Sequence, residues 1–278
     1  MNIEDITNRF SNLRGLKLLK KGGQKTVYAA LSNVYGPVVL KLMKATPRID
    51  REVAIVKQYG FTGVPKIYDM GEICDLGDFS MYIVEQRVDG VDLKQYLQNN
   101  NAPVDAKFVI RMMRSLFVTL GELEDKGIVH RDIKPDNIIV DSGGMFWLLD
   151  FGIARVANDI SLTRTDAVHG PCTPGYGAPE QVLNYKAAID SRADLYSLGV
   201  TAYELLTGIN PFHRDVDNPL GAMIQSVTLE VQTLEIPEDS SGSFAKFIKM
   251  MMNKNKSFRP PNVKQAYEWF ERVVEGIA

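Results

Sequence analysis

Residues 128–140 read IVHRDIKPDNIIV, and this stretch decides the fold of the chain. Two short apolar runs flank a polar segment, which predicts that residues 130–137 form a loop at the edge of strands. Asp132 and Asn137 lie five positions apart with Lys134 between them, so one loop carries a carboxylate, an amide oxygen and an ammonium group. Carboxylate and amide oxygens suit Mg²⁺, which usually binds substrate phosphates as well.

Two further motifs follow in order along the chain. Residues 147–154, WLLDFGIA, end an apolar run with Asp150, and residues 171–180 read PCTPGYGAPE. A metal-binding carboxylate beside a second, metal-free carboxylate is sufficient for phosphoryl transfer, which depends mostly on positioning and charge neutralisation. HRDIKPDN, DFG and GAPE in this order resemble the catalytic loop, metal motif and activation-segment end of Hanks-type serine/threonine protein kinases, bacterial members included. The resemblance extends over residues 13–272.

The resemblance implies an α+β, bilobed protein-kinase fold. Residues 1–88 would form the small N-terminal lobe, an antiparallel sheet with one important helix, and their short alternating runs agree with this. Residues 89–278 would form the larger, mainly helical lobe. Apolar periodicity there predicts helices over residues 105–126, 193–208 and 262–276, the second of them apolar on nearly every side and therefore deep in the core.

Catalytic roles follow from the same resemblance. Asp132 would orient the substrate hydroxyl and accept its proton, and Lys134 would steady the transferred phosphoryl group. Asn137 and Asp150 would hold Mg²⁺, with Mn²⁺ as an alternative. Each motif alone is compatible with a capped loop or a solvated carboxylate, but the set in register favours catalysis.

Two residues of the N-terminal region would complete the site. Lys41 ends the apolar run PVVLK and matches the lysine that such kinases place on the α- and β-phosphates of ATP. Glu52, in the helical segment that follows, would hold Lys41 through an ion pair. The alternatives are a strand-end lysine that extends to solvent and an exposed helix glutamate.

Residues 20–25, KKGGQK, correspond to the glycine-rich loop of the family but contain fewer glycines. With Val27 aligned to the valine after the third glycine, Lys20, Gly22 and Lys25 occupy the three glycine positions. Gly22 and Gly23 still permit a tight turn, and Lys25 and Lys21 add cations where phosphates would lie. We interpret this segment as a variant loop that still covers ATP.

Residues 81–93, MYIVEQRVDGVDL, align with the segment that joins the lobes. Glu85 would lie at the back of the adenine pocket, Val88 would supply backbone contacts to adenine, and Asp92 would reach the ribose hydroxyls. A buried glutamate needs a partner or a raised pKa. The alternative is that Glu85 points away from the site.

Substrate-side residues indicate serine/threonine specificity. Lys134 and Thr173 match the serine/threonine pattern of the family. Three further residues are assigned scaffold roles: Glu180 would pair with Arg259, and Asp194 would anchor the backbone of the catalytic loop.

Arg131, immediately before Asp132, is typical of kinases that are activated by phosphorylation of the activation segment. Thr163 and Thr165 are the first candidates for that phosphorylation, followed by Ser161.

The composition of the chain argues against several other classes of function. The chain has 278 residues, 45% hydrophobic and 24% charged, and a formal net charge of −2, which argues against a general nucleic-acid or membrane-surface binder. Two cysteines without metal-site spacing and the absence of a signal-like or membrane-spanning run predict a cytoplasmic protein. The expected function is therefore an MgATP-dependent kinase of protein substrates. Two alternatives remain: a pseudokinase that binds nucleotide or acts as a scaffold, favoured by the missing glycines, and a small-molecule phosphotransferase, which the DFG-to-APE segment opposes.

Overall fold

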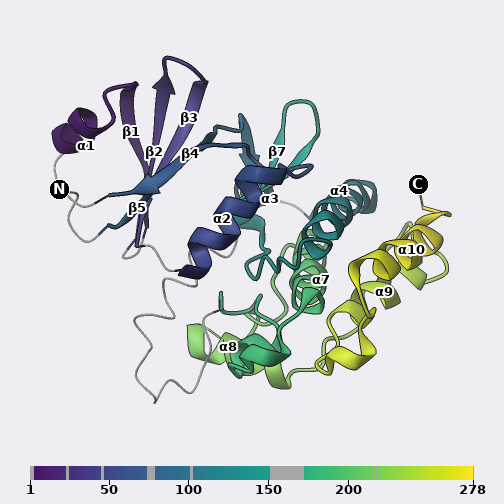
Figure 1. Ribbon diagram of the computed structural model, residues 1–278. Coiled ribbons are helices and arrows are strands. Elements are labelled where there is room, and N and C mark those ends of the chain that lie inside the picture. The colour runs from purple at the N-terminus through teal and green to yellow at the C-terminus, as the bar shows by residue number, and fades with distance from the viewer. Residues whose placement is uncertain are drawn as a thin grey trace.

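The computed structural model describes residues 3–22, 25–44, 47–73, 79–100, 103–150, 172–216 and 218–277, without the side chains of residues 47–52. Its N-terminal part is a five-stranded antiparallel sheet in the order β1-β2-β3-β5-β4 (Figure 1). The strands are β1 (Leu13–Lys21), β2 (Lys25–Ser32), β3 (Gly36–Met43), β4 (Ile67–Glu72) and β5 (Met81–Gln86). The short alternating runs of the N-terminal region, at residues 27–31, 37–43 and 81–88, correspond to β2, β3 and β5, with small shifts of their ends.

The two faces of this sheet bury different sets of side chains, because successive residues of a strand point to opposite sides. On one face, Leu40 and Val84 pack with Ile6 and Phe10, which come from or directly follow α1 (Ile3–Arg9). On the other face, Met43, Met81 and Ile83 pack in one cluster with Val53 and Val56 of α2 (Pro47–Tyr59). Helix α2 therefore lies on the face that also carries Lys41.

The C-terminal part is mainly helical. Its helices are α3 (Leu93–Asn100), α4 (Ala106–Glu124), α6 (Pro179–Val182), α7 (Ser191–Thr207), α8 (Pro219–Thr228), α9 (Ser243–Met251) and α10 (Val263–Val274). Helices α4, α7 and α10 confirm the three predicted ones, and local chemistry sets their ends. Asp105 and Asn262 cap α4 and α10 by accepting the N–H groups of Phe108 and Gln265, and Gly208 ends α7 with a φ of 75°.

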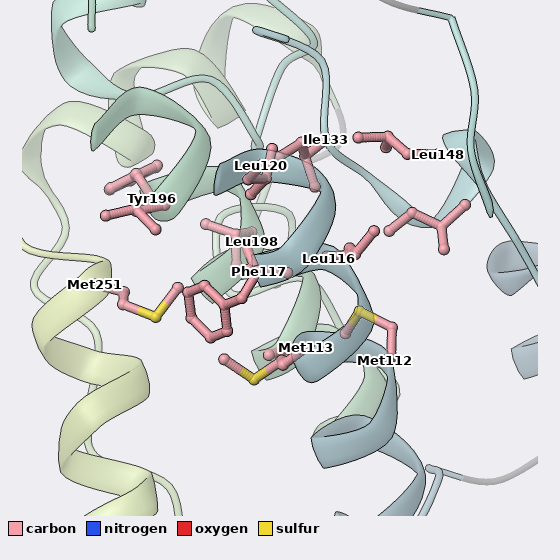
Figure 2. Close-up of a cluster of buried hydrophobic side chains, with 14 of the residues drawn as sticks. Met112, Met113, Leu116, Phe117, Leu120, Ile133, Leu148, Tyr196, Leu198 and Met251 are labelled. Atoms are coloured by element: carbon pink, nitrogen blue, oxygen red, sulfur yellow. The ribbon is translucent and has the colours of Figure 1, made fainter. Parts of the chain in front are cut away.

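The core of this part lies where α4, α7 and α9 meet. Every residue from 193 to 203 in α7 is buried, as its nearly uniform apolar character predicts. Figure 2 shows Met113 and Phe117 of α4 beside Leu198 of α7 and Met251 of α9. The methionines of these helices fill the core, since flexible thioether side chains suit irregular gaps.

A small second sheet connects the two parts. It contains β6 (Gly90–Asp92), β7 (Ile138–Asp141) and β8 (Phe146–Leu148), and short 3₁₀ turns span Pro135–Asn137, Lys186–Ala188 and Lys256–Phe258. The predicted lobe boundary at residues 88/89 falls in the short connection between β5 and β6. A small antiparallel sheet followed by a larger helical region is the expected α+β arrangement. In the ranges described, no helix is long and apolar enough to cross a bilayer.

Candidate active site

Three ionisable side chains share one face of the five-stranded sheet. In the antiparallel register, Lys25 lies opposite Met43, Val27 opposite Lys41, and Val39 opposite Glu85. Because side chains alternate along a strand, Lys25, Lys41 and Glu85 all point to the face that α2 covers. Lys41 and Glu85 are diagonal neighbours on adjacent strands, within reach of each other.

Asp150 joins these three side chains in a cluster of two cations and two carboxylates. Lys41 Nζ lies 2.5 Å from Glu85 Oε1 and 2.8 Å from Asp150 Oδ1, and Lys25 Nζ lies 2.7 Å from Asp150 Oδ2. The side chains of Lys41 and Glu85 are only 5% and 10% exposed. Charges buried this deeply require partners, and the cluster supplies them in equal number.

The cluster shifts the pKa values of its members. Burial lowers the pKa of Lys41, but Asp150 and Glu85 outweigh burial and raise it above its ordinary value. Burial raises the pKa of Asp150, yet the two lysines bring it well below its ordinary value. Burial dominates at the other two groups, so the pKa of Glu85 is raised and that of Lys25 is lowered. Asp150 and Lys41 are therefore the most firmly ionised pair.

Glu85 lines the cavity and contacts Lys41. Glu85 is buried and has both of the features that a buried glutamate needs, a partner in Lys41 and a raised pKa. The alternative that Glu85 points away from the site is wrong. The predicted pair between Lys41 and Glu52 stays a prediction, because the side chain of Glu52 lies outside the described residues.

The loop at residues 130–137 places Asp132 in a second group of polar side chains. Thr173 donates its hydroxyl to Asp132 Oδ1 at 2.7 Å and accepts a hydrogen bond from Lys134 Nζ at 2.9 Å. Lys134 Nζ also lies 3.2 Å from Asp132 Oδ2. The structure therefore brings a carboxylate, a cation and a threonine hydroxyl from two separate motifs into one contact group.

His130 holds this loop in place through two hydrogen bonds of its imidazole ring. Its Nε2 donates to the carbonyl of Leu149 at 2.9 Å, because a carbonyl can only accept, and its Nδ1 accepts the N–H of Asp132 at 3.2 Å. The neutral tautomer with hydrogen on Nε2 thus satisfies both contacts. Asn137 adds two links: its side-chain N–H₂ donates to the carbonyl of Asp132 at 2.8 Å, and its own carbonyl accepts the N–H of Leu149 at 2.8 Å. Asp132, Asn137 and the residue before Asp150 are held as one unit.

Helix α7 holds the backbone of the same loop. Asp194, buried in α7, accepts the N–H groups of His130 and Arg131, each at 2.7 Å, which confirms its predicted anchoring contact. Arg131 has a φ of 70°, and Gln181 donates its side-chain amide to the Arg131 carbonyl at 3.1 Å. A left-handed conformation at a residue with a long side chain is costly and needs such support.

The predicted pair between Glu180 and Arg259 is also present. Arg259 Nη1 and Nη2 donate to the two oxygens of Glu180 at 2.7 and 2.9 Å, and the Arg259 side chain is fully buried. Further donations from Arg259 reach the carbonyls of Arg192, Asn253 and Lys254. This bidentate pair ties the end of the APE motif to the C-terminal helices.

A cavity of about 410 Å³ lies between the two parts of the fold, next to the charged cluster. It is lined by Leu19, Lys20, Val27, Val39, Lys41, Glu85, Gln86, Arg87, Val88, Gly90, Asp92, Gln95, Asp136, Asn137, Ile139, Leu149 and Asp150. Seven of the predicted site residues are in this lining: Val27, Lys41, Glu85, Val88, Asp92, Asn137 and Asp150. Its apolar walls, with cations and carboxylates at one end, fit a flat base with a phosphate chain, and its volume is typical of a ligand pocket.

The glycine-poor loop is placed in part. Gly22 donates its N–H to the carbonyl of Lys25, the first residue of β2, at 2.9 Å. Lys25 is not itself among the lining residues, but it contacts Asp150, which is. Gly23, and likewise Phe151, Ser161, Thr163 and Thr165, lie outside the described residues.

Asn137 and Asp150 are the donors available for a divalent metal. The amide nitrogen of Asn137 is used by the loop, which leaves its oxygen as a candidate ligand, and Asp150 would add a carboxylate that here contacts Lys25 and Lys41. Across the described ranges, no group of three His, Cys, Asp or Glu side chains could hold a metal without other ligands. A metal here would depend on ligand phosphates and water as well.

The sequence reasoning missed the contacts of Lys25 and Glu85. It placed both near the nucleotide but did not find that Lys25 reaches Asp150 or that Glu85 reaches Lys41. The alternation of side chains in the three strands was the signal that could have put Lys25, Lys41 and Glu85 on one face. Gln181, which supports the Arg131 carbonyl, was also missed, and no sequence pattern marks that contact.

Comparison with known proteins identifies the family. The sequence model described as the protein kinase domain matches residues 17–270, nearly the whole chain. The chain belongs to the protein kinase family. Among its relatives, the probable serine/threonine-protein kinase pknA2 of Bifidobacterium longum is 30% identical over 268 residues, 92% of this chain and 34% of that protein. The serine/threonine-protein kinase PrkC of Bacillus subtilis is 32% identical over 216 residues, 74% of this chain and 32% of that protein.

A solved structure agrees on the fold. The kinase domain of Mycobacterium tuberculosis PknI superposes with a TM-score of 0.65 at 20% sequence identity, covering 94% of this chain and 96% of that domain. This likeness supports the bilobed kinase fold. The chain spans between about a third and a half of the length of the curated relatives it matches.

Proposed function

We propose that this kinase-family protein transfers the γ-phosphoryl group of ATP to serine and threonine hydroxyls of protein substrates. The observation that carries the proposal is the contact group of Asp132, Lys134 and Thr173. A carboxylate that already accepts a hydrogen bond from the threonine hydroxyl can accept one from a substrate hydroxyl of the same chemistry. The relatives named serine/threonine-protein kinases support the same specificity.

ATP would occupy the cavity between the sheet and the helical part. The apolar side chains of Val27, Val39 and Leu149 would enclose the base, Val88 would offer backbone contacts, and Asp92 would meet the ribose. Lys41 and Lys25 would compensate the charge of the phosphates. Asp92 also accepts the N–H of Gln95 at 2.8 Å, which fixes its position at the start of α3.

Asn137 and Asp150 would hold a divalent metal, which we propose to be Mg²⁺, with Mn²⁺ as a substitute. When bound, MgATP supplies the transferable phosphoryl group and neutralises much of its charge. This chain's own residues do the rest. Asp132 orients the hydroxyl and accepts its proton, and Lys134 offsets negative charge beside it. Glu180, Arg259 and Asp194 keep the surrounding backbone in place.

The proposal extends to the setting of the enzyme. The two cysteines lack the spacing of a disulfide framework or a metal site and so favour a reducing compartment, and we place the protein in the cytoplasm. Phosphorylation of Thr163 or Thr165 would provide a partner for Arg131 and so regulate the site.

Transfer of labelled phosphate from MgATP to a generic basic protein tests this function. The wild-type protein should label serine and threonine but not tyrosine, and Asp132→Asn should lower the rate by about 10²–10⁴-fold, the usual contribution of a general base. Asp125→Asn, at an exposed carboxylate where α4 ends and outside the cavity lining, is the matched control and should retain activity. Wild-type protein that binds ATP but labels nothing would instead support the nucleotide-binding pseudokinase.

A further inference from the structure

Lys41 has two anionic partners, and they differ in kind. Asp150 is the aspartate of the DFG motif and the candidate metal ligand, whereas Glu85 lies within strand β5. A carboxylate that must also serve a metal is a poor sole support for a lysine, because both cations draw on the same oxygens. Glu85 has no such second task in the proposed chemistry.

Strand pairing gives the contact of Lys41 with Glu85 a fixed geometry. Strands β3 and β5 pair without a register shift from Val38–Gln86 to Met43–Met81, and Lys41 and Glu85 lie two positions apart within that ladder. Both side chains are buried, and their charged atoms are 2.5 Å apart. A contact within one continuous ladder cannot be broken by the movement of a helix that packs against the sheet.

Burial makes the two side chains depend on each other. Removing one partner of a buried ion pair leaves an uncompensated charge, so both side chains are held in the paired rotamers. Ile83, the residue directly opposite Lys41, and Met43, which lies on the same face of the sheet, are also buried, so apolar side chains lie beside the pair. This surrounding reduces screening by water and strengthens the attraction.

We infer that Glu85 is a positioning residue for Lys41, so that the sheet itself, rather than helix α2 alone, sets the place of the phosphate-binding lysine. The inference rests on the proposed function in one respect: Lys41 is taken to contact nucleotide phosphates. It differs from the pairing of Lys41 with Glu52 in naming a residue of β5. Glu85 acts through Lys41 and is not assigned any contact with the reacting atoms.

Binding of ADP in EDTA provides the first test, because ADP carries the phosphates that Lys41 would meet and the chelator removes the metal from consideration. Calorimetry would compare wild type, Glu85→Gln, Glu52→Gln, Lys41→Met and the double variant of Glu85→Gln with Lys41→Met. Glu85→Gln should weaken ADP binding about tenfold, at least as much as Glu52→Gln. In the Lys41→Met background it should have less than a twofold effect, because the inferred action through Lys41 has gone.

Two outcomes of that cycle would overturn the inference. One is a change of less than twofold for Glu85→Gln in the presence of Lys41. The other is an equal loss with and without Lys41, which would indicate a general structural role. If Glu85→Gln does not unfold cooperatively in urea, Glu85→Met replaces it, since an apolar side chain of similar length suits a buried position.

A second test detects the ion pair of Lys41 with Glu85 by NMR in the absence of nucleotide. Its result therefore does not depend on the proposed function. Buried, paired ammonium groups exchange their protons slowly, and we expect a resolved ¹⁵N-correlated ammonium signal that disappears in Lys41→Met. The signal should persist in Glu52→Gln and shift or broaden beyond detection in Glu85→Gln. An unchanged signal in Glu85→Gln would overturn the inference. Failure of wild type to bind ADP would overturn the proposed function, while the ammonium signal would still report on the pair.

Discussion

Two buried groups of charges in this molecule are built differently. The pair of Glu180 and Arg259 in the helical part has one carboxylate, one guanidinium and a set of backbone carbonyls that occupy the remaining donors. The cluster beside the cavity has two lysines that both contact Asp150, and Lys41 also contacts Glu85. The first arrangement is closed and bidentate, and the second is made of point charges that can exchange partners.

This difference separates scaffold from site. The guanidinium of Arg259 has a single carboxylate at fixed geometry, and its role is to connect α6 with the turn before α10. Lysine ammonium groups can form new contacts with phosphates without losing a defined fork geometry. A binding site that must accept and release an anion benefits from the second arrangement. The following predictions test whether the two groups really behave as scaffold and site.

The largest expected effect is on the scaffold pair. Arg259→Met should lower the free energy of unfolding by about 3–5 kcal/mol, because it leaves the buried carboxylate of Glu180 without its partner. Urea denaturation measures this loss. The double variant Glu180→Met with Arg259→Met should recover part of it, since no unpaired charge remains. A loss below about 1 kcal/mol in the single variant would mean that the pair is no scaffold.

Lys254 provides a contrast within the same part of the fold. Its Nζ donates to Tyr196 Oη at 3.0 Å and the Ser226 carbonyl at 2.8 Å, and it lies 4.0 Å from the centre of the Phe212 ring. Burial lowers the pKa of Lys254 from 10.5 to about 7. Between these two values the unfolded chain binds a proton that the folded chain does not, so stability should rise with pH by about 1.4 kcal/mol per unit.

Urea denaturation at pH 7 to 10 checks this prediction. The profile of wild type minus that of Lys254→Met isolates the lysine from groups that titrate in both proteins. The difference should rise with pH throughout this range and level off below pH 7, where both states are protonated. A flat difference would show that the neutral oxygens and the Phe212 ring compensate the charge as fully as Glu180 compensates Arg259.

A smaller effect is expected for the site cluster. Lys25→Met should weaken ADP binding in EDTA by about tenfold, because one phosphate-compensating cation is lost. Its effect on unfolding should be well below that of Arg259→Met, since Asp150 retains Lys41. The control is Lys17→Met, at an exposed lysine of β1 outside the cavity lining. Equal losses of stability in Lys25→Met and Arg259→Met would remove the distinction between the two groups of charges.

The smallest effect on stability is expected at a helix cap that belongs to neither group of charges. Asp105 caps α4 by accepting the N–H of Phe108 at 2.7 Å, and Asp105→Ala should cost about 1 kcal/mol of unfolding free energy. ADP affinity should not change. Calorimetry and urea denaturation on the same sample give both values, and a change in affinity would mean that general loss of stability reaches the cavity.

Local sequence was sufficient for much of the fold. Asp105 and Asn262 before apolar periodic runs mark helix starts, and these caps are present in the structure. The loop at residues 130–137 was placed because its motif is dense in special residues. The pairing of Glu180 with Arg259 was predicted from the resemblance to the kinase family and not from the local sequence.

What sequence could not predict is which charges meet. Glu85 and Lys41 are 44 positions apart, and their contact depends on the register of β3 and β5, which no local pattern determines. Lys25 was assigned to the phosphates, and its contact with Asp150 depends on how closely β2 approaches the helical part. Both cases concern long-range geometry, where several partners are chemically equivalent until the chain is folded.

The most direct test of the central claim, that the cluster beside the cavity serves phosphoryl transfer, is mass spectrometry of the purified protein after incubation with MgATP. Wild type should gain phosphate on serine or threonine, with Thr163 or Thr165 first, and Asp150→Ala and Asp132→Asn should gain none. Phosphate that appears equally in these variants would contradict the account. Wild-type protein that phosphorylates neither itself nor a basic protein would also contradict the account. The chain would then be a kinase-family scaffold without catalysis.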